Sequence, residues 1–227
     1  QLQGTVNNIT GYDLLLCSPS FKHHIDEADL IIQFSDHLVS KRLTQYIGST
    51  PAPIWVVSEY TQRIDPAHCV TQRFVSNAKN FIKQTYNNKK TDKNWLEKVK
   101  KYQERLPDII NPYLLDDQIS EANTTAHVLN HSKDNIMLGN SLAIRLADMF
   151  ANTNATIYSN RGASGIDGVI ATAVGIAKKR QGATTLLIGD TSFLYDLNSL
   201  ALLAQLKQPF VIVLLNNDGG GMFNLLP

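Results

Sequence analysis

The clearest pattern of apolar and polar positions lies near the end of the chain. Residues 186–188 and 211–215 are apolar runs, and each ends abruptly in polar and glycine residues. Such runs are typical of buried parallel strands whose carboxyl ends open onto a loop. Between them, residues 193–208 carry apolar side chains at helical spacing. The pattern therefore predicts a strand–helix–strand unit.

The same alternation extends back to residue 121. It predicts helices at residues 121–129, 141–150 and 166–179, and strands at residues 135–138, 155–158, 184–188 and 210–215. Strands that alternate with helices in this order are typical of a mainly parallel sheet. The crossover connections between such parallel strands are right-handed in nearly all proteins. We therefore expect an α/β domain with at least four strands.

The first part of the chain has a shorter version of this order. Strands are predicted at residues 28–34 and 54–57, and helices at residues 39–47 and 74–86. This order indicates a small Rossmann-like parallel-sheet domain. It contains no Gly-x-Gly-x-x-Gly sequence, so a dinucleotide site is not supported there.

A polar stretch separates these two parts. Residues 87–93 lack apolar periodicity and are predicted to be a solvated linker. Residues 95–102 are predicted to form a basic amphipathic helix. Its lysines could bind an acidic partner, but a solvent-exposed helix face explains them better. We assign residues 1–88 to the first domain, 89–118 to a linker with a helix, and 119–227 to the second domain. The expected fold is α/β, with two parallel-sheet domains.

Composition narrows the function classes. The net charge is +1, which argues against a nucleic-acid surface, and no apolar run is long enough to span a membrane. The N-terminus has no signal-peptide pattern. Cys17 and Cys69 have no metal-site spacing, which fits thiols in a reducing, cytoplasmic compartment.

Two polar residues follow the predicted strands of the last unit directly. Asp190 comes after one strand and Asn217 after the next, each beside glycine. Ligands of open α/β sheets bind outside the carboxyl ends of the strands. Carboxylate, amide and carbonyl oxygens suit hard cations such as Mg²⁺, which also uses phosphate oxygens. The sequence thus predicts a cation site at this edge, although two ordinary loops would have the same composition.

Two further loops belong to the same edge if the sheet is parallel. Ser141 lies near the start of a helix, where an ordinary N-cap is the simpler explanation. Arg145 falls on the same helix face four residues later, and a surface ion pair is its simpler explanation. Arg161 follows Asn160 and precedes a run of small residues, a position from which a guanidinium can hold a carboxylate with two hydrogen bonds.

Gly189-Asp190 followed by Asn216-Asn217 resembles the signature of thiamine-diphosphate enzymes. The resemblance implies that Asp190, Asn217 and the carbonyl of Gly219 hold the Mg²⁺ (or Mn²⁺) that bridges the cofactor's diphosphate. The family usually has Gly-Asp-Gly, whereas Thr191 stands at the third position here. A non-catalytic α/β binding module remains the non-enzyme alternative.

A more specific resemblance comes from four motifs in order. They are Gly139-Asn140-Ser141 with Arg145, residues 159–168, residues 189–200 and residues 216–221. Together they are similar to the 2-succinyl-5-enolpyruvyl-6-hydroxy-3-cyclohexene-1-carboxylate synthase family of thiamine-diphosphate enzymes. The similarity is close over residues 135–227 and looser over residues 1–90. It implies a fragment that covers the central domain and the front of the C-terminal cofactor-binding domain, truncated at both ends.

The resemblance implies a transferase of menaquinone biosynthesis. Such an enzyme uses thiamine diphosphate and Mg²⁺ to decarboxylate 2-oxoglutarate and adds the succinyl carbanion to isochorismate in a 1,4-addition. Both substrates carry carboxylates, so arginines in the cleft have a physical task. Another thiamine-diphosphate enzyme, such as a 2-oxoacid decarboxylase or acetohydroxyacid synthase, would keep Asp190 and Asn217 but not the Arg145 and Arg161 motifs.

By motif position, the resemblance also assigns site residues. The substrate-binding set is Asn140, Ser141, Arg145, Arg161, Phe223 and Leu226, with Lys41 and Arg42 as weaker members from the central domain. The cofactor-binding set is Ile166, Gly189, Asp190, Thr191, Ser192, Asn217, Gly219, Gly220 and Met222. For the apolar members Ile166, Met222, Phe223 and Leu226, plain packing explains the residue equally well.

One role has no residue in this chain. Thiamine-diphosphate enzymes activate the cofactor through a glutamate on the pyrimidine-binding domain, normally supplied by a neighbouring subunit. No domain here matches that one, so we expect the 227-residue chain alone to be inactive. We also expect the full-length protein to work as a homodimer or homotetramer.

Overall fold

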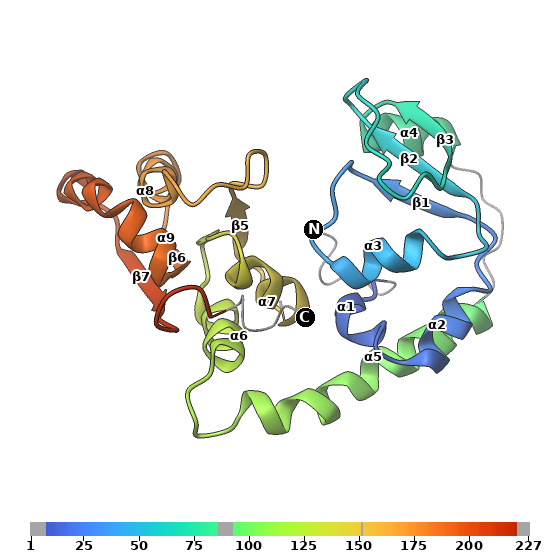
Figure 1. Cartoon of the computed structure of the whole chain (residues 1–227), viewed down its shortest axis with the longest axis horizontal. Helices are drawn as coiled ribbons and strands as arrows, with labels where there is room; N and C mark the ends of the chain where they lie inside the picture. The colour runs from blue at the N-terminus through green and yellow to red at the C-terminus, as the bar shows by residue number, and fades with distance from the viewer. Residues whose placement is uncertain (1–7, 86–92, 151, 222–227) are drawn as a thin grey trace. The chain divides into compact units, whose positions relative to one another are not determined.

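The computed structural model describes residues 8–85, 93–150 and 152–221, and they form two compact units. The first unit comprises the described residues of 9–109, and the second comprises Asn8 and the described residues from 110 onward. Each unit contains one sheet of parallel strands flanked by helices (Figure 1). The predicted α/β class with two parallel-sheet domains is confirmed.

The first unit has a three-stranded sheet in the order β1-β2-β3. The strands are β1 (Ile31–Phe34), β2 (Ile54–Ser58) and β3 (Val70–Val75). Its helices are α1 (Tyr12–Leu15), α2 (Pro19–Ile25), α3 (Lys41–Ile47), α4 (Ala78–Thr85) and the first part of α5 (Lys93–Leu114).

Strand β2 supplies apolar side chains to both faces of this sheet. Ile54 and Val56 belong to the core that includes residues of α1, α2 and α3. Alternate side chains of a strand point to opposite faces, and Trp55 accordingly packs against Phe74 of β3, with ring centroids 5.2 Å apart. Phe81 of α4 lies 4.9 Å from Phe74, so α4 covers this second face.

The predicted helix at residues 74–86 is wrong in its first part. Residues 70–75 form strand β3, which pairs in parallel with β2, and the helix begins only at Ala78. The β-branched and aromatic residues of this stretch favour a strand. Polar residues at its solvent-facing positions interrupt the continuous apolar run from which the buried strands were predicted.

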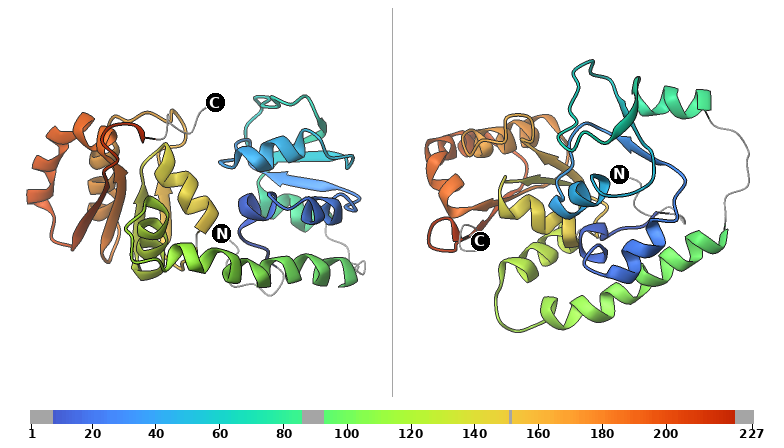
Figure 2. Two further views of the ribbon diagram at one scale, coloured as in Figure 1. Left: turned by 60° about the horizontal axis from the view of Figure 1, so that its bottom comes forward. Right: turned by 45° about the vertical axis from the view of Figure 1, so that its right-hand side comes forward.

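Helix α5 is longer than the predicted amphipathic helix at residues 95–102, and its first part packs against the core of the first unit. Val99 is fully buried, and Trp95, Tyr102 and Leu106 pack against the same core. The indole N–H of Trp95 donates to the carbonyl oxygen of His24 in α2 at 2.9 Å. Figure 2 shows α5 alongside α1 and α2. The first unit therefore includes most of this helix.

The second unit has a four-stranded parallel sheet in the order β5-β4-β6-β7. Its strands are β4 (Asn135–Leu138), β5 (Thr156–Ser159), β6 (Thr184–Gly189) and β7 (Phe210–Leu215). Its helices are α6 (Glu121–His131), α7 (Leu142–Phe150), α8 (Val169–Lys179), α9 (Asp190–Tyr195) and the 3₁₀ helix η1 (Leu197–Gln205).

The central strands β4 and β6 are buried on both faces. Met137, Leu186 and Ile188 pack against α8 in one core cluster. The alternate residues Ile136 and Leu187 are also fully buried. The chain leaves β4 toward β5 and returns from β5 toward β6, so right-handed connections place α7 and α8 on opposite faces. Helices on both faces explain why these strands read as continuous apolar runs.

Two predicted helices of this unit differ from the structure. The helix expected from residue 166 begins at Val169. Gly168, the residue before it, has φ +67°. This left-handed conformation, which glycine adopts readily, does not belong to a right-handed helix. The helix expected at residues 193–208 is divided into α9 and η1. The division falls at Asp196, whose carboxylate accepts the backbone N–H groups of Ile170 and Ala171 in α8 at 2.6 and 3.1 Å.

Within the described ranges, no helix combines the length and apolar character needed to cross a membrane.

Candidate functional site

A pocket of about 510 Å³ lies at the carboxyl edge of the second sheet. Four predicted substrate-binding residues line it: Asn140, Ser141, Arg145 and Arg161. Seven predicted cofactor-binding residues also line it: Ile166, Gly189, Asp190, Thr191, Ser192, Asn217 and Gly220. These residues follow β4, β5, β6 and β7, and parallel strands bring their carboxyl ends to one edge. The structure thus brings together residues from four separate motifs.

Asp190 links the two loops that carry the predicted metal ligands. Its Oδ2 atom accepts the backbone N–H of Gly219 at 2.8 Å and that of Asn217 at 3.3 Å. Its Oδ1 atom accepts the backbone N–H of Thr191 at 2.6 Å and the Thr191 hydroxyl at 3.2 Å. The residue that departs from the family's usual Gly-Asp-Gly therefore adds a donor to the key carboxylate.

These donors favour the ionised form of Asp190. Burial alone would raise the pKa of the carboxyl group, but the hydrogen bonds from Gly219, Thr191 and Asn217 outweigh it and lower the pKa. Hydrogen bonds to the ionised form favour that form. Asp190 is thus a carboxylate at neutral pH, as a cation ligand has to be.

Asn217 supplies the second oxygen of the predicted metal site. Its Oδ1 atom accepts the backbone N–H of Gly221 at 2.9 Å, and its Nδ2 atom donates to Oε1 of Glu121 at 3.0 Å. A carboxylate, an amide oxygen and the carbonyl of Gly219 are hard donors that fit Mg²⁺ or Mn²⁺. The described residues hold no cluster of three or more His, Cys, Asp or Glu suited to a metal.

The loop after β5 is tied to the loop after β4. The Nδ2 atom of Asn140 donates to the carbonyl oxygens of Asn160 at 3.2 Å and Gly165 at 2.6 Å. Its Oδ1 atom accepts from the guanidinium of Arg161 at 3.4 Å. Asn140 is buried. It therefore fixes the loop that carries Arg161 and Ile166.

Arg145 lines the same pocket as Arg161. One of its guanidinium nitrogens donates to the carbonyl oxygen of Ser141, one turn earlier, at 2.6 Å. The side chain is otherwise exposed. A guanidinium has five N–H donors, so this contact leaves others for an anionic ligand.

Among the described residues, three predicted ones do not line the pocket: Gly219, Lys41 and Arg42. Gly219 joins the site through its bond to Asp190. Lys41 and Arg42 lie in α3 of the first unit, and Arg42 forms an ion pair there with the buried carboxylate of Asp13. Three predictions, Met222, Phe223 and Leu226, fall outside the described residues.

The sequence analysis missed several residues of the pocket, above all Glu121. Ser120 and Asn123 form a capping box at the start of α6, which places Glu121 in the first turn of the helix. The Ser-x-x-Asn pattern was a visible signal for the helix start, but not for the contact with Asn217, which is 96 residues away. Ser164 and Leu215 also line the pocket without having been predicted.

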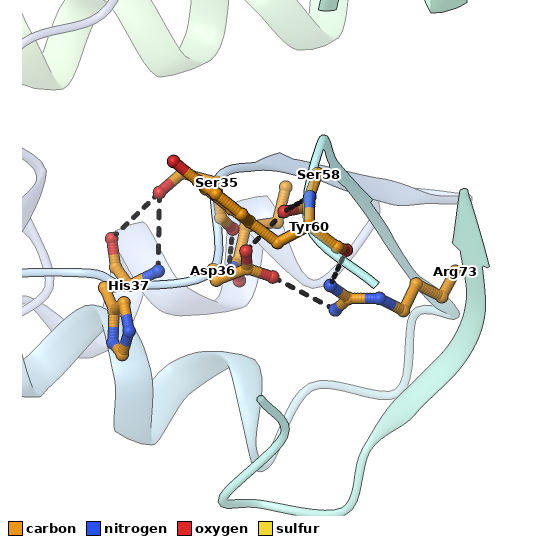
Figure 3. Close-up of polar contacts among 7 residues, drawn as sticks. Ser35, Asp36, His37, Ser58, Tyr60 and Arg73 are labelled. Atoms are coloured by element: carbon orange, nitrogen blue, oxygen red, sulfur yellow. Dashed lines mark hydrogen bonds and ion pairs between the residues drawn. The ribbon is translucent and has the colours of Figure 1, made fainter. Parts of the chain in front are cut away.

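The carboxyl edge of the first sheet is built differently (Figure 3). Asp36, which follows β1, accepts a hydrogen bond from the Ser58 hydroxyl at the end of β2 and pairs with Arg73 of β3 at 3.0 Å. The guanidinium of Arg73 also donates to the carbonyl oxygen of Tyr60 at 2.7 Å. Asp36 and Arg73 thus neutralise each other within the unit, and their contacts link its three strands.

Two family models match the chain. Residues 1–138 match a model described as "Middle domain of thiamine pyrophosphate", and residues 140–226 match "Thiamine pyrophosphate enzyme, C-terminal TPP binding domain". The pocket lies almost wholly within the second match. Thiamine pyrophosphate is another name for thiamine diphosphate.

Three curated relatives share one name. The chain is 47% identical over 231 aligned residues to the 2-succinyl-5-enolpyruvyl-6-hydroxy-3-cyclohexene-1-carboxylate synthase of Psychromonas ingrahamii. This alignment covers 100% of the chain and 40% of that protein. Proteins of the same name from Shewanella loihica and Actinobacillus succinogenes are 39% and 38% identical over 96% and 95% of the chain. The chain spans about 40% of the length of these relatives.

Proposed function

Because the chain belongs to the thiamine pyrophosphate enzymes, we propose that the full-length protein is a 2-succinyl-5-enolpyruvyl-6-hydroxy-3-cyclohexene-1-carboxylate synthase. It decarboxylates 2-oxoglutarate and transfers the succinyl carbanion to isochorismate, with thiamine diphosphate and Mg²⁺ as cofactors. The observation that carries the proposal is the joint presence of Asp190, Asn217, Arg145 and Arg161 in one pocket. A metal–diphosphate site beside two arginines suits a reaction between anionic substrates.

The protein's own groups divide this task. Asp190, Asn217 and the carbonyl of Gly219 would hold the cation that neutralises the diphosphate. Thiamine diphosphate, when bound, acts as the electron sink for the decarboxylation. Protein groups orient the substrates and offset the charge of their carboxylates.

The loop after β5, which carries Arg161, is suited to orienting the substrates and offsetting the charge of their carboxylates. Asn140 fixes the loop through two backbone carbonyls and accepts from Arg161. The guanidinium is thus held at the pocket wall before a substrate arrives. Arg145 is exposed at the same pocket. Preorganised cations of this kind lower the barrier of a reaction in which carboxylates gather in one cleft.

The proposal includes the assembly. The glutamate that activates the cofactor in this family has no counterpart in these residues, so the isolated chain is inactive in this account and the complete site forms in a cytoplasmic homodimer or homotetramer. Measurable synthase activity of the isolated 227-residue chain would contradict this part.

A substrate test with the full-length protein distinguishes the proposal from its neighbours in the family. Mass spectrometry would follow 2-oxoglutarate consumption in the presence of Mg²⁺ and thiamine diphosphate, with and without isochorismate. The proposal predicts rapid consumption only with isochorismate, together with the adduct that has lost carbon dioxide. Consumption at the same rate without isochorismate would identify a simple 2-oxoacid decarboxylase instead.

A further inference from the structure

One wall of the pocket is the first turn of α6, and Glu121 is the acidic residue of that turn. Its Oε1 atom accepts a hydrogen bond from Nδ2 of Asn217 at 3.0 Å. Asn217 is the residue whose amide oxygen belongs to the cation site. The hydrogen bond to Glu121 of α6 therefore affects the orientation of a predicted metal ligand.

An asparagine amide has two ends, and only its oxygen binds a cation. The Nδ2 group carries two N–H donors and no available lone pair. If the amide rotated by half a turn, these donors would face the cation. The oxygen end already accepts from Gly221 at 2.9 Å and keeps a second lone pair.

Glu121 selects between these two orientations. An ionised carboxylate only accepts hydrogen bonds, so it pairs with the amide nitrogen and repels the amide oxygen. The N–H of Gly221 favours the same orientation from the other end. Gly221 also has to lack a side chain, because an added Cβ atom would lie 2.9 Å from Cγ of Asn217. Two independent contacts thus fix one orientation.

The start of α6 holds Glu121 in place. The Ser120 hydroxyl accepts the N–H of Asn123 at 3.1 Å, and Oδ1 of Asn123 accepts the N–H of Ser120 at 2.8 Å. This capping box fixes the first turn of the helix.

We propose that Glu121 is a positioning residue that keeps the amide oxygen of Asn217 turned toward the divalent cation. The inference rests on the proposed function, since it requires the cation site. It adds a residue to that site that does not itself bind the metal. Partners that orient a metal ligand commonly change metal affinity about 10- to 100-fold when they are removed.

The test measures metal affinity directly, without turnover. Mn²⁺ is titrated into the full-length protein in the presence of thiamine diphosphate, and free Mn²⁺ is followed by electron paramagnetic resonance. We expect Glu121→Ala to raise the Mn²⁺ dissociation constant about 10-fold or more. Glu121→Gln can still accept from the amide nitrogen through its own oxygen, so its constant should stay within about threefold of the unsubstituted protein.

A matched control separates orientation from charge. Asp117→Asn removes one negative charge from an exposed residue four positions before Glu121 that does not line the pocket, and it should leave the affinity unchanged. In an Asn217→Ala background, Glu121→Ala should weaken Mn²⁺ binding little further, because the ligand it orients is gone. Full additivity of the two substitutions would overturn the proposal.

The outcomes also separate this inference from the proposed function. If Glu121→Ala and Glu121→Gln both bind Mn²⁺ as the unsubstituted protein does, the role of Glu121 is overturned while the synthase remains. If the unsubstituted protein binds no Mn²⁺ with thiamine diphosphate, both are overturned. Should Glu121→Ala not fold, as thermal unfolding without metal would reveal, Glu121→Leu and Glu121→Gln decide the matter, with weak binding expected only for the leucine variant.

Discussion

The carboxylate of Asp190 accepts the backbone N–H of Gly219 at 2.8 Å, although 29 residues separate them in the chain. Asp190 begins α9 directly after β6, and Gly219 lies in the loop after β7. The contact ties together the two loops that carry the three predicted oxygen donors of the proposed cation site. The donors are therefore gathered before a cation binds, which reduces the ordering that binding would otherwise require.

The charge of Asp190 should make this arrangement sensitive to acid. Because the folded-state pKa is lowered, the carboxylate contributes stability that is fully present above the unfolded-state pKa of about 3.9. The contribution is lost as the pH falls through the lowered folded-state value. We expect Asp190→Asn to be less stable than the unsubstituted protein at pH 6, and the difference to shrink below about pH 4. Urea unfolding at several pH values measures it, and a difference independent of pH would contradict the assignment.

Arg161 should affect substrate binding more than cofactor binding. Hydrogen bonds to charged groups contribute about 1.5–3 kcal/mol, so Arg161→Ala should raise KM for 2-oxoglutarate or isochorismate about 10- to 100-fold. Arg180→Ala is a matched control, because Arg180 caps the far end of α8 and lies over the Tyr158 ring at 5.8 Å. Steady-state kinetics and calorimetric titration of thiamine diphosphate check the two effects. A loss of cofactor affinity with unchanged KM would reverse the expected role.

Lys41 and Arg42 are neighbours in α3 with different expected roles. Arg42 pairs with the buried carboxylate of Asp13, which also accepts from the Ser40 hydroxyl. Arg42→Ala should therefore lower the free energy of unfolding by about 1–2 kcal/mol, since it leaves a buried charge with one partner fewer. Lys41→Ala should leave stability unchanged. Thermal unfolding of both variants tests this, and equal stability would show that the Arg42 pair is not structural.

Asp196 should stabilise α8 from outside that helix. Its Oδ2 atom accepts two N–H groups of the first turn of α8, and Oδ1 accepts the Ser199 hydroxyl at 2.6 Å. We expect Asp196→Ala to cost about 1–2 kcal/mol, as the loss of a helix cap does. Asp196→Asn keeps one acceptor oxygen and should cost less. Urea unfolding gives both values, and equal losses for the two variants would argue against the capping role.

Much of the second unit follows from local sequence. The strands predicted at residues 135–138 and 210–215 coincide with β4 and β7. The apolar run of β4 reflects a strand buried on both faces, whereas β7 lies at the edge of the sheet and leaves Val211 and Leu214 exposed. The first unit was harder to predict. Its third strand, β3, has polar residues at solvent-facing positions, so its pattern was taken as the start of a helix.

Two other misses share one physical cause, which is contact over long sequence distances. The helix predicted at residues 193–208 breaks at Asp196 because that side chain bonds to α8, 26 residues earlier. Glu121 reaches Asn217 over 96 residues. Local periodicity carries no signal for either contact. The motif residues that line the pocket were found because their positions resemble those of a known family, and their individual roles remain predictions.

The most direct test of the account concerns the proposed cation site of Asp190, Asn217 and Gly219. Thiamine diphosphate is titrated calorimetrically into the full-length protein with and without Mg²⁺, and the titration is repeated with Asp190→Ala and with Asp117→Asn. The account predicts that tight binding requires Mg²⁺, that Asp190→Ala weakens it about 100-fold or more, and that Asp117→Asn does not. Equal binding by Asp190→Ala, or binding indifferent to Mg²⁺, would contradict it.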